Sequence, residues 1–285
     1  MTALNYLESL NPLQYESVCS TEGPNLIIAG AGTGKTKVLT TRVAHIIDNN
    51  LAFPSQILCV TFTNKAAREM SERVQKLVNQ NMEKMPWMGT FHSIGAKIIR
   101  NHAEVIGLKQ SFTILDKDDQ LSLIKQIIKA ENLDQSQFSP KLIQSKIDHW
   151  KNKALNPNEI KSETLDNLVD EKSLSIYQIY QARLFEINCL DFGDLLLQCI
   201  NLFKVPDIHK RYSNNFKYIH VDEYQDTNAA QYKWLKLLGS HHKNVCCVGD
   251  DDQSIYSWRG AEVDNMLRFE KEFENAKVIR LKQNY

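Results

Sequence analysis

The most constraining feature of this sequence is a glycine-rich segment between an apolar run and a helical one. Leu26–Ala29 is a short β-rich run, Gly30–Gly34 contains three glycines, and a helical pattern begins at Lys35. Small side chains let backbone N–H groups converge on phosphate oxygens, and the following helix adds the positive end of its dipole. Ala29–Thr36 therefore predicts a nucleotide-phosphate loop, with Ala29 standing where the strict pattern has glycine.

The side chains of this loop suit triphosphate chemistry. Lys35 would reach the β- and γ-phosphates as a point charge, and the hydroxyl of Thr36 would ligate Mg²⁺. A chance glycine-rich turn is the competing interpretation, and Gly-Lys-Thr between a strand and a helix argues against it. We predict ATP and Mg²⁺ as cofactors, with loop contacts from Gly30, Ala31, Gly32, Thr33, Gly34, Lys35 and Thr36.

Two adjacent acids follow another apolar run. Asp222 and Glu223 come directly after Tyr218–Val221. At the end of a strand, Asp222 could hold Mg²⁺ while Glu223 orients and deprotonates the attacking water. A solvated acidic turn would be the simpler interpretation of these residues alone, but the phosphate loop favours the catalytic one. We expect Gly34–Thr36 and the two acids to meet around one triphosphate.

Alternating patterns along the chain predict the fold class. Continuous apolar runs alternate with helical periods in two stretches, as in a parallel sheet covered on both faces. We predict an α/β domain of residues 1–92 and 216–285, interrupted by a mostly helical domain of residues 93–215. The expected strands are Leu26–Ala29, Ile57–Val60, Trp87–Thr90, Tyr218–Val221, Asn244–Val248 and Val278–Leu281. The clearest helical periods are 35–48, 65–78, 118–130, 140–150, 173–188 and 191–203.

Composition excludes several classes of protein. The 285 residues carry a formal net charge of zero, so any surface for a polyanion must be local. No apolar run approaches the roughly 20 residues of a membrane span, and the first residues lack a signal-peptide pattern. The six cysteines form no Cys-x-x-Cys pair, which favours reduced, buried thiols. We expect a cytoplasmic protein without a membrane partner.

Five further motifs point to one family. They are Leu10–Gln14, Thr61–Ala67, Gly89–Ser93, Val221–Asn228 and Gly249–Ala261. Together with the phosphate loop they resemble the superfamily 1 DNA helicases of the UvrD/Rep/PcrA type, over essentially the whole chain. The resemblance implies a RecA-like P-loop NTPase domain that carries an inserted helical subdomain.

The resemblance also implies roles at the nucleotide. Gln14 would hydrogen-bond adenine and Tyr285 would stack on it. Gln253 would contact the γ-phosphate and report hydrolysis, and Arg259 would make a second phosphate or switch contact. Arg42 completes the predicted nucleotide contacts. In the family an arginine follows the tyrosine, and a second motor domain supplies another arginine. We therefore expect this chain alone to bind nucleotide weakly and not to unwind duplex DNA.

The resemblance places single-stranded DNA across the top of the sheet. Phe62, Tyr256 and Trp258 would be stacking platforms, each worth roughly 1–3 kcal/mol per base. Ordinary core packing is the competing interpretation of each aromatic taken singly, and Phe62 is more core-like than Trp258. The expected contacts to backbone phosphates are Thr61, Thr63, Asn64, Thr90 and His92.

The combined expectation is an ATP-dependent motor that moves 3′-to-5′ on single-stranded DNA and at junctions with duplex DNA, in repair or replication. A C-terminal motor domain would complete it. The alternatives are a catalytically incomplete module for single strands and nucleotide, and the motor part of a helicase–nuclease. Gly193 replaces an acid of a family motif in Leu190–Leu196, and we expect it to weaken a helix start there.

Overall fold

The computed structural model describes residues 6–30, 32–78, 85–165, 167–250 and 265–281. The chain divides into two compact units. Unit 1 contains Met1–Ile94, Pro206–Thr227 and Leu235–Tyr285. Unit 2 contains Gly95–Val205 and Asn228–Trp234.

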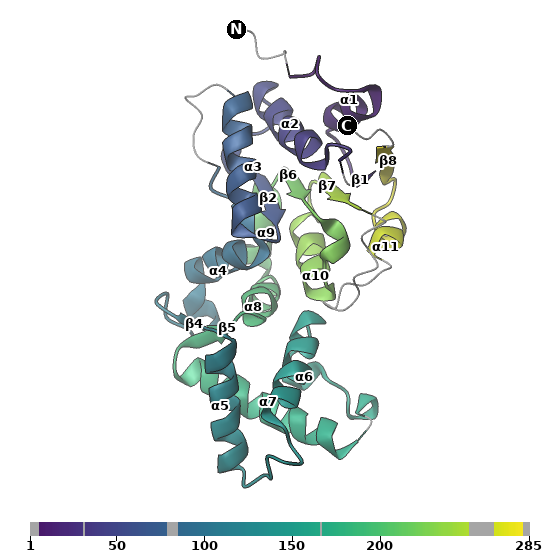
Figure 1. The fold of residues 1–285 in the computed structure, drawn as a ribbon. Coiled ribbons are helices and arrows are strands. Elements are labelled where there is room, and N and C mark those ends of the chain that lie inside the picture. Colours follow the sequence, from purple (N-terminus) through teal and green to yellow (C-terminus); the bar gives the residue numbers. More distant parts are fainter. Residues whose placement is uncertain (1–5, 31, 79–84, 166, 251–264, 282–285) are drawn as a thin grey trace. The chain divides into compact units, whose positions relative to one another are not determined.

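Unit 1 is built on a six-stranded sheet in which every described pair of strands is parallel (Figure 1). The strand order is β3-β2-β6-β7-β1-β8. The carboxyl ends of parallel strands meet at one edge of a sheet, so the segments that follow these strands are brought together. The predicted α/β fold with a parallel sheet is confirmed. The strands are β1 (Asn25–Ala29), β2 (Ile57–Thr61), β3 (Met88–Thr90), β6 (Tyr218–Val221), β7 (Val245–Gly249) and β8 (Lys277–Leu281).

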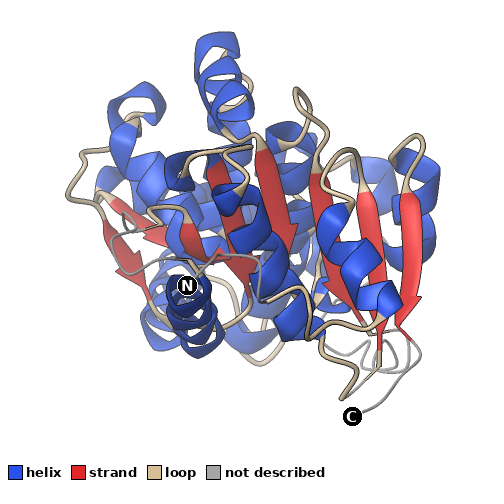
Figure 2. Ribbon diagram, turned by 90° about the horizontal axis from the view of Figure 1, so that it is seen from above, coloured by secondary structure: helices blue, strands red, loops and turns tan. Residues whose placement is uncertain are grey.

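Helices cover both faces of this sheet (Figure 2). On one face the strand residues Ile27, Cys59 and Cys246 join a buried core with Val38 and Met70 from the helices. On the other face the end of α10 approaches β7 closely at Gly239. A methyl group added at Gly239 would lie only 2.6 Å from the side chain of Val245. The helices of unit 1 are α1 (Pro12–Cys19), α2 (Lys35–Asp48), α3 (Asn64–Leu77), α9 (Pro206–Asn215), α11 (Asn265–Glu272), and parts of α4 (Phe91–Asn101) and α10 (Ala229–Leu238).

Local signals in the sequence explain where these elements begin. All residues of β1, β2 and β7 are buried, which accounts for their continuous apolar runs. Thr63 caps α3 by accepting a hydrogen bond from the backbone N–H of Ala66 at 3.1 Å. Asn11 and Gln14 form a capping box at the start of α1.

Unit 2 is mostly helical and has its own apolar core. Ile124, Ile143, Ile147, Tyr177 and Leu184 are among its buried members. The main elements are α5 (Lys117–Ala130), α6 (Pro140–Asn152), α7 (Leu168–Glu186) and α8 (Asp194–Leu202), with a two-stranded sheet of β4 (Thr113–Leu115) and β5 (Cys189–Asp191).

The expected helix at 191–203 is wrong at its start. Cys189–Asp191 pairs in parallel with Thr113–Leu115, so α8 begins only at Asp194. Gly193 adopts ordinary helical angles, and a Cβ there would lie 2.8 Å from Cδ of Lys151. Glycine at this position therefore makes room for the buried lysine chain.

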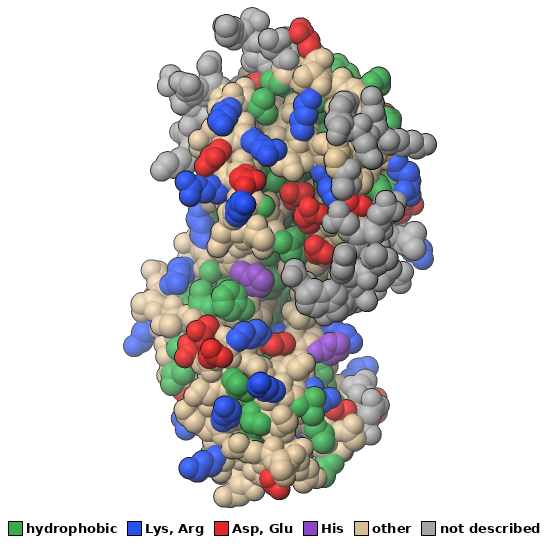
Figure 3. Space-filling view, viewed as in Figure 1, with side chains coloured by type: hydrophobic (Ala, Val, Ile, Leu, Met, Phe, Trp, Pro, Cys, Tyr) green, Lys and Arg blue, Asp and Glu red, His purple; other side chains and the backbone are tan. Residues whose placement is uncertain are grey.

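Among the described residues, no helix combines the length and the apolar character needed to cross a membrane. The six cysteines, all of them in described segments, are unpaired, and five are buried. On the face drawn in Figure 3, both basic and acidic side chains lie on the described surface of each unit.

Candidate nucleotide site

The predicted phosphate loop forms a tight turn between β1 and α2. The hydroxyl of Thr33 donates to the carbonyl of Gly30 at 2.8 Å. Gly32 and Gly34 have φ of 80° and 89°, in the left-handed region that favours glycine. A Cβ at Gly34 would also lie 2.8 Å from Nε2 of Gln14. The backbone angle thus requires glycine at position 34, and a side chain there would also displace the Gln14 amide.

Gln14 ties the loop to the first helix. Its Nε2 donates to the carbonyl of Thr33 at 3.0 Å, and its Oε1 accepts from the backbone N–H of Asn11 at 3.2 Å. The side chain is fully buried. The structure therefore brings this predicted nucleotide contact directly against the phosphate loop.

Lys35 links the loop to two acids from other strands. Its Nζ lies 3.0 Å from Oδ2 of Asp250 and 3.7 Å from Oε2 of Glu223. Asp250 follows β7, which lies between β6 and β1 in the sheet, so strand order explains the meeting. The phosphate loop and the acidic strand end, which lie far apart in sequence, share one site.

Asp250 and Gln225 belong to this site and were missed as site residues by sequence reasoning. The backbone N–H of Asp250 donates to Oε1 of Gln225 at 3.0 Å, and Nε2 of Gln225 donates to Glu223 at 2.6 Å. Both side chains are buried. The available signal was an acid directly after the apolar run Val245–Gly249, in the same pattern as Asp222 after β6.

The two adjacent acids have different environments. Burial, reinforced by the charge of Glu223, raises the pKa of Asp222 to about 6. The backbone N–H of Glu223 donates to Oδ1 of Asp222 at 3.0 Å and opposes that rise, as does the charge of Lys35. Glu223 itself has φ of 52° and ψ of 46°, a left-handed conformation that is rare outside glycine, asparagine and aspartate.

The oxygen groups at this edge fit Mg²⁺ held jointly with phosphates. Within the described chain no group of three or more His, Cys, Asp or Glu side chains could hold a metal by itself. Mg²⁺ commonly uses one or two carboxylates together with substrate phosphates and waters. The hydroxyl of Thr36 and the carboxylate of Asp222 are such hard ligands, so the donor set suits this ion.

The predicted DNA contacts of β2 and β3 share the same edge of the sheet. Thr61 and Thr90 are in register on these neighbouring parallel strands. The ring of Phe62 meets the buried ring of Phe91 edge-on, with centroids 5.5 Å apart. Phe62 is itself only partly buried.

The polar members of this group are already organised by local hydrogen bonds. The buried hydroxyl of Thr61 donates to the carbonyl of Thr63 at 3.0 Å. Thr90 and Ser93 exchange hydrogen bonds between side chain and backbone at 2.9 and 3.1 Å. Burial lowers the pKa of His92, which favours its neutral form. Asn64, at the start of α3, is exposed.

Arg42 lies elsewhere in unit 1. It is buried in α2, where its guanidinium donates to the carbonyls of Ser17 at 2.6 Å and Thr21 at 3.1 Å. These contacts join α2 to the end of α1, and they do not bring Arg42 to the phosphate loop. Six predicted site residues lie outside the described residues: Ala31, Gln253, Tyr256, Trp258, Arg259 and Tyr285.

Comparison with known proteins gives a consistent result. The family model of the UvrD/REP helicase N-terminal domain matches residues 10–274. The chain is 52% identical to DNA helicase II of Rickettsia typhi over 285 residues, which cover 99% of this chain and 43% of that protein. It is 50% identical to a probable DNA helicase II homolog of Rickettsia felis over 284 residues, with the same coverage.

A third relative comes from another organism. The chain is 49% identical to the ATP-dependent DNA helicase PcrA of Staphylococcus aureus over 280 residues, covering 98% of this chain and 38% of that protein. The chain thus spans about two-fifths of the length of these relatives.

Proposed function

This chain belongs to the UvrD/REP helicase family, and from that premise we propose that it is the nucleotide-binding part of an ATP-dependent DNA helicase. One contact carries the proposal: Lys35 of the phosphate loop lies between Asp250 and Glu223 at the carboxyl edge of the sheet. A phosphate loop, a lysine and acids for metal and water are the parts that nucleotide hydrolysis requires.

Each described residue of the site then has a distinct task. The backbone N–H groups of the loop and the dipole of α2 bind the phosphates. Lys35 exchanges its contacts with Asp250 and Glu223 for phosphate oxygens. Thr36 and Asp222 would hold Mg²⁺, which, when bound, neutralises phosphate charge. Glu223 orients the attacking water and accepts its proton.

Single-stranded DNA is the proposed track. The proposed DNA contacts at the ends of β2 and β3 lie at the same carboxyl edge of the sheet as the nucleotide site, which supports this role. They are Thr61, Phe62, Thr63, Asn64, Thr90 and His92. The resemblance to the family supports 3′-to-5′ movement, action at single-strand to duplex junctions and cooperation with a second motor domain. It also supports stacking by Tyr256 and Trp258, with Gln253 and Arg259 coupling DNA to nucleotide.

The test is ATP hydrolysis measured with and without single-stranded DNA. We expect DNA to stimulate hydrolysis by the wild type, and Lys35→Ala and Glu223→Gln to reduce the stimulated rate by about a hundredfold or more. Lys37→Ala is the matched control, because Nζ of Lys37 bonds the carbonyl of Ser9, away from the acids.

Two outcomes would change the assignment. Equal hydrolysis by the wild type, Lys35→Ala and Glu223→Gln would show that the site is placed wrongly. Nucleotide and single-strand binding by the wild type without any hydrolysis would instead favour the alternative of a catalytically incomplete binding module.

A further inference from the structure

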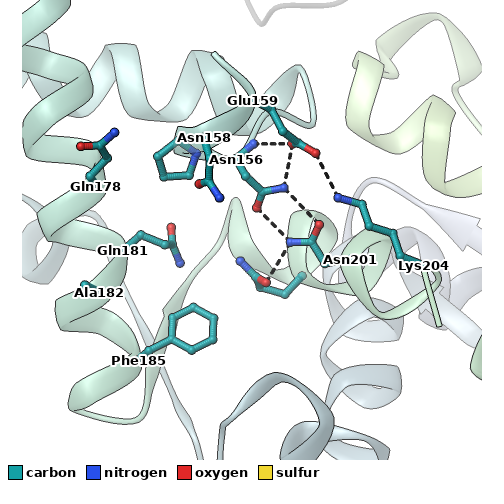
Figure 4. A pocket seen from close by; sticks show the side chains of 11 residues that line it. Asn156, Asn158, Glu159, Gln178, Gln181, Ala182, Phe185, Asn201 and Lys204 are labelled. Carbon is teal, nitrogen blue, oxygen red and sulfur yellow. Dashed lines mark hydrogen bonds and ion pairs between the residues drawn. The ribbon is translucent and has the colours of Figure 1, made fainter. Parts of the chain in front are cut away.

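Unit 2 contains a pocket that the proposed nucleotide chemistry does not use. Its volume is about 500 Å³, and its walls come from α7, α8 and the short helical segment Pro157–Glu159 (Figure 4). Pockets of this size accept small organic molecules. Six side-chain amides line it: Asn156, Asn158, Gln178, Gln181, Gln198 and Asn201.

One wall presents amides in fixed orientations. Asn156 and Asn201 exchange two hydrogen bonds, at 3.1 and 2.9 Å. Nδ2 of Asn201 also donates to Oε1 of Gln198 at 3.1 Å. Nδ2 of Asn156 also donates to Oε2 of Glu159 at 2.7 Å, so the N–H groups of Asn156 and Asn201 are used within the wall. The side-chain amides of Asn158 and Gln178 make no hydrogen bond within the described residues and are the ones open to a ligand.

The opposite wall, on α7, has an unused hydrogen-bond acceptor. Nε2 of Gln181 donates to both carboxylate oxygens of Asp194, at 3.1 and 3.2 Å, which fixes the amide. Its Oε1 is buried and finds no donor within the described residues. A buried acceptor without a donor is unfavourable. The oxygen lies beneath the pocket surface, so an N–H group of a ligand would reach it only after the amide turns toward the pocket. Figure 4 shows Gln181 and Phe185 extending from α7 toward the amides across the pocket.

The chemistry of the walls selects a planar, neutral, polar ligand. The charged side chains at the pocket, Lys204 and Glu159, pair with each other at 3.0 Å and so offer little to a free phosphate. Asparagine and glutamine amides match the paired donor and acceptor groups on the edges of nucleobases. Phe185 adds an aromatic surface of the kind on which bases stack.

We propose that this pocket binds an unpaired nucleobase of single-stranded DNA. The inference rests on the proposed function for the identity of the strand. It rests on the open amides of Asn158 and Gln178 and on the ring of Phe185 for the identity of the bound group. The pocket would hold one base out of the stack while the strand passes unit 2.

Photochemical labelling tests the proposal directly. An oligothymidine carrying one iododeoxyuridine and the free iododeoxyuridine nucleoside are used as separate probes of the whole 285-residue chain. Under light the carbon–iodine bond breaks and a carbon–carbon bond to a nearby aromatic ring forms, with loss of hydrogen iodide. We expect both probes to label Phe185, located by mass spectrometry of the digested protein.

A pair of substitutions at one position provides the control. Ala182 lines the pocket from an exposed position of α7, so both variants are expected to fold. Ala182→Trp fills the pocket and should reduce labelling of Phe185 about tenfold or more, whereas Ala182→Ser leaves it open and should retain labelling. Gln178→Ala, also at an exposed position, removes one lining amide and should lower labelling without filling the pocket.

The outcomes separate this inference from the proposed function. Labelling confined to other residues, or equal labelling of Phe185 in Ala182→Trp and Ala182→Ser, overturns the nucleobase pocket. DNA-stimulated hydrolysis in the same preparation, without labelling of Phe185, rejects the pocket alone. Labelling of Phe185 by the free nucleoside in a protein that DNA does not stimulate keeps the pocket and counts against the helicase function.

Discussion

Glu223, the proposed water-orienting residue, holds its backbone in the left-handed region. An L-residue with a Cβ is strained there by about 1 kcal/mol or more, whereas glycine is not. The strain lies at the carboxyl end of β6. There the chain turns so that Glu223 faces Lys35 while Asp222 stays buried. Strain at such a position is a common property of functional sites.

Glycine should therefore be preferred over alanine at position 223. We expect Glu223→Gly to be more stable than Glu223→Ala by about 1 kcal/mol, measured by chemical denaturation. Glu72, exposed within α3, is the control, because there glycine should be less stable than alanine by about 1 kcal/mol. The same order of stabilities at both positions would contradict strain at Glu223.

Asp222 predicts a pH dependence of stability. Its pKa in the folded protein is about 6, above the ordinary value of 3.8, because burial and then Glu223 disfavour the charged form. The folded state therefore binds this proton more tightly than the unfolded state does. The contribution of Asp222 to stability is fully present below about pH 4 and is lost as pH rises through about 6.

An asparagine at this position cannot titrate and resembles the protonated acid, so Asp222→Asn is a direct probe of this effect. Without nucleotide or metal, we expect Asp222→Asn to exceed the wild type in unfolding free energy by up to about 3 kcal/mol at pH 8, with the difference closing near pH 4. Exposed Glu274→Gln controls for the loss of one negative charge. A difference independent of pH would contradict the raised pKa.

At the scale of elements, a buried ion cluster joins α6, β5 and α8 in unit 2. Nζ of Lys151 lies 2.7 Å from Asp191 and 2.9 Å from Asp194, and all three side chains are almost inaccessible to solvent. Burial opposes the negative charge of Asp191. The charge of Lys151 and the hydrogen bonds from Lys151, the backbone of Asp194 and Tyr180 together outweigh burial and lower the pKa of that carboxyl. Burial and the charge of Asp191 raise the pKa of Asp194.

Removing the lysine should be costly. Lys151→Met leaves two buried carboxyl groups without their cation, and we expect a loss of about 3–5 kcal/mol in unfolding free energy. Lys153→Met, at the exposed end of the same helix, should change it by less than about 0.5 kcal/mol. Thermal or chemical denaturation of both variants measures the difference, and similar losses would contradict a special role for the buried lysine.

The elements differ in how well sequence predicts them. β6 and α2 have the expected bounds. A fully buried parallel strand leaves a continuous apolar run, and α2 begins directly after the recognisable phosphate loop. The pairing of β4 with β5 could not be predicted, since each has three residues and their partners are distant in sequence. The contact of Lys35 with Asp250 depends on strand order, which local patterns do not encode.

At the scale of the whole molecule, the chain matches 43% of the Rickettsia typhi relative. Strand separation in the family is proposed to need two motor domains, so we expect these 285 residues to bind nucleotide without unwinding duplex DNA. A fluorescent duplex with a single-stranded 3′ tail measures this. Robust unwinding by the purified chain, lost in Lys35→Ala, would contradict the expectation.

The strand order also has a consequence during synthesis on the ribosome. β1 lies between β7 and β8, and both of these neighbours are encoded after unit 2. At about 5–20 residues per second, the stretch between Ala29 and Val245 takes roughly 10–40 s to translate. An apolar strand without neighbours for that time is a target for aggregation, so nascent chains of this protein should depend on chaperones until β7 emerges.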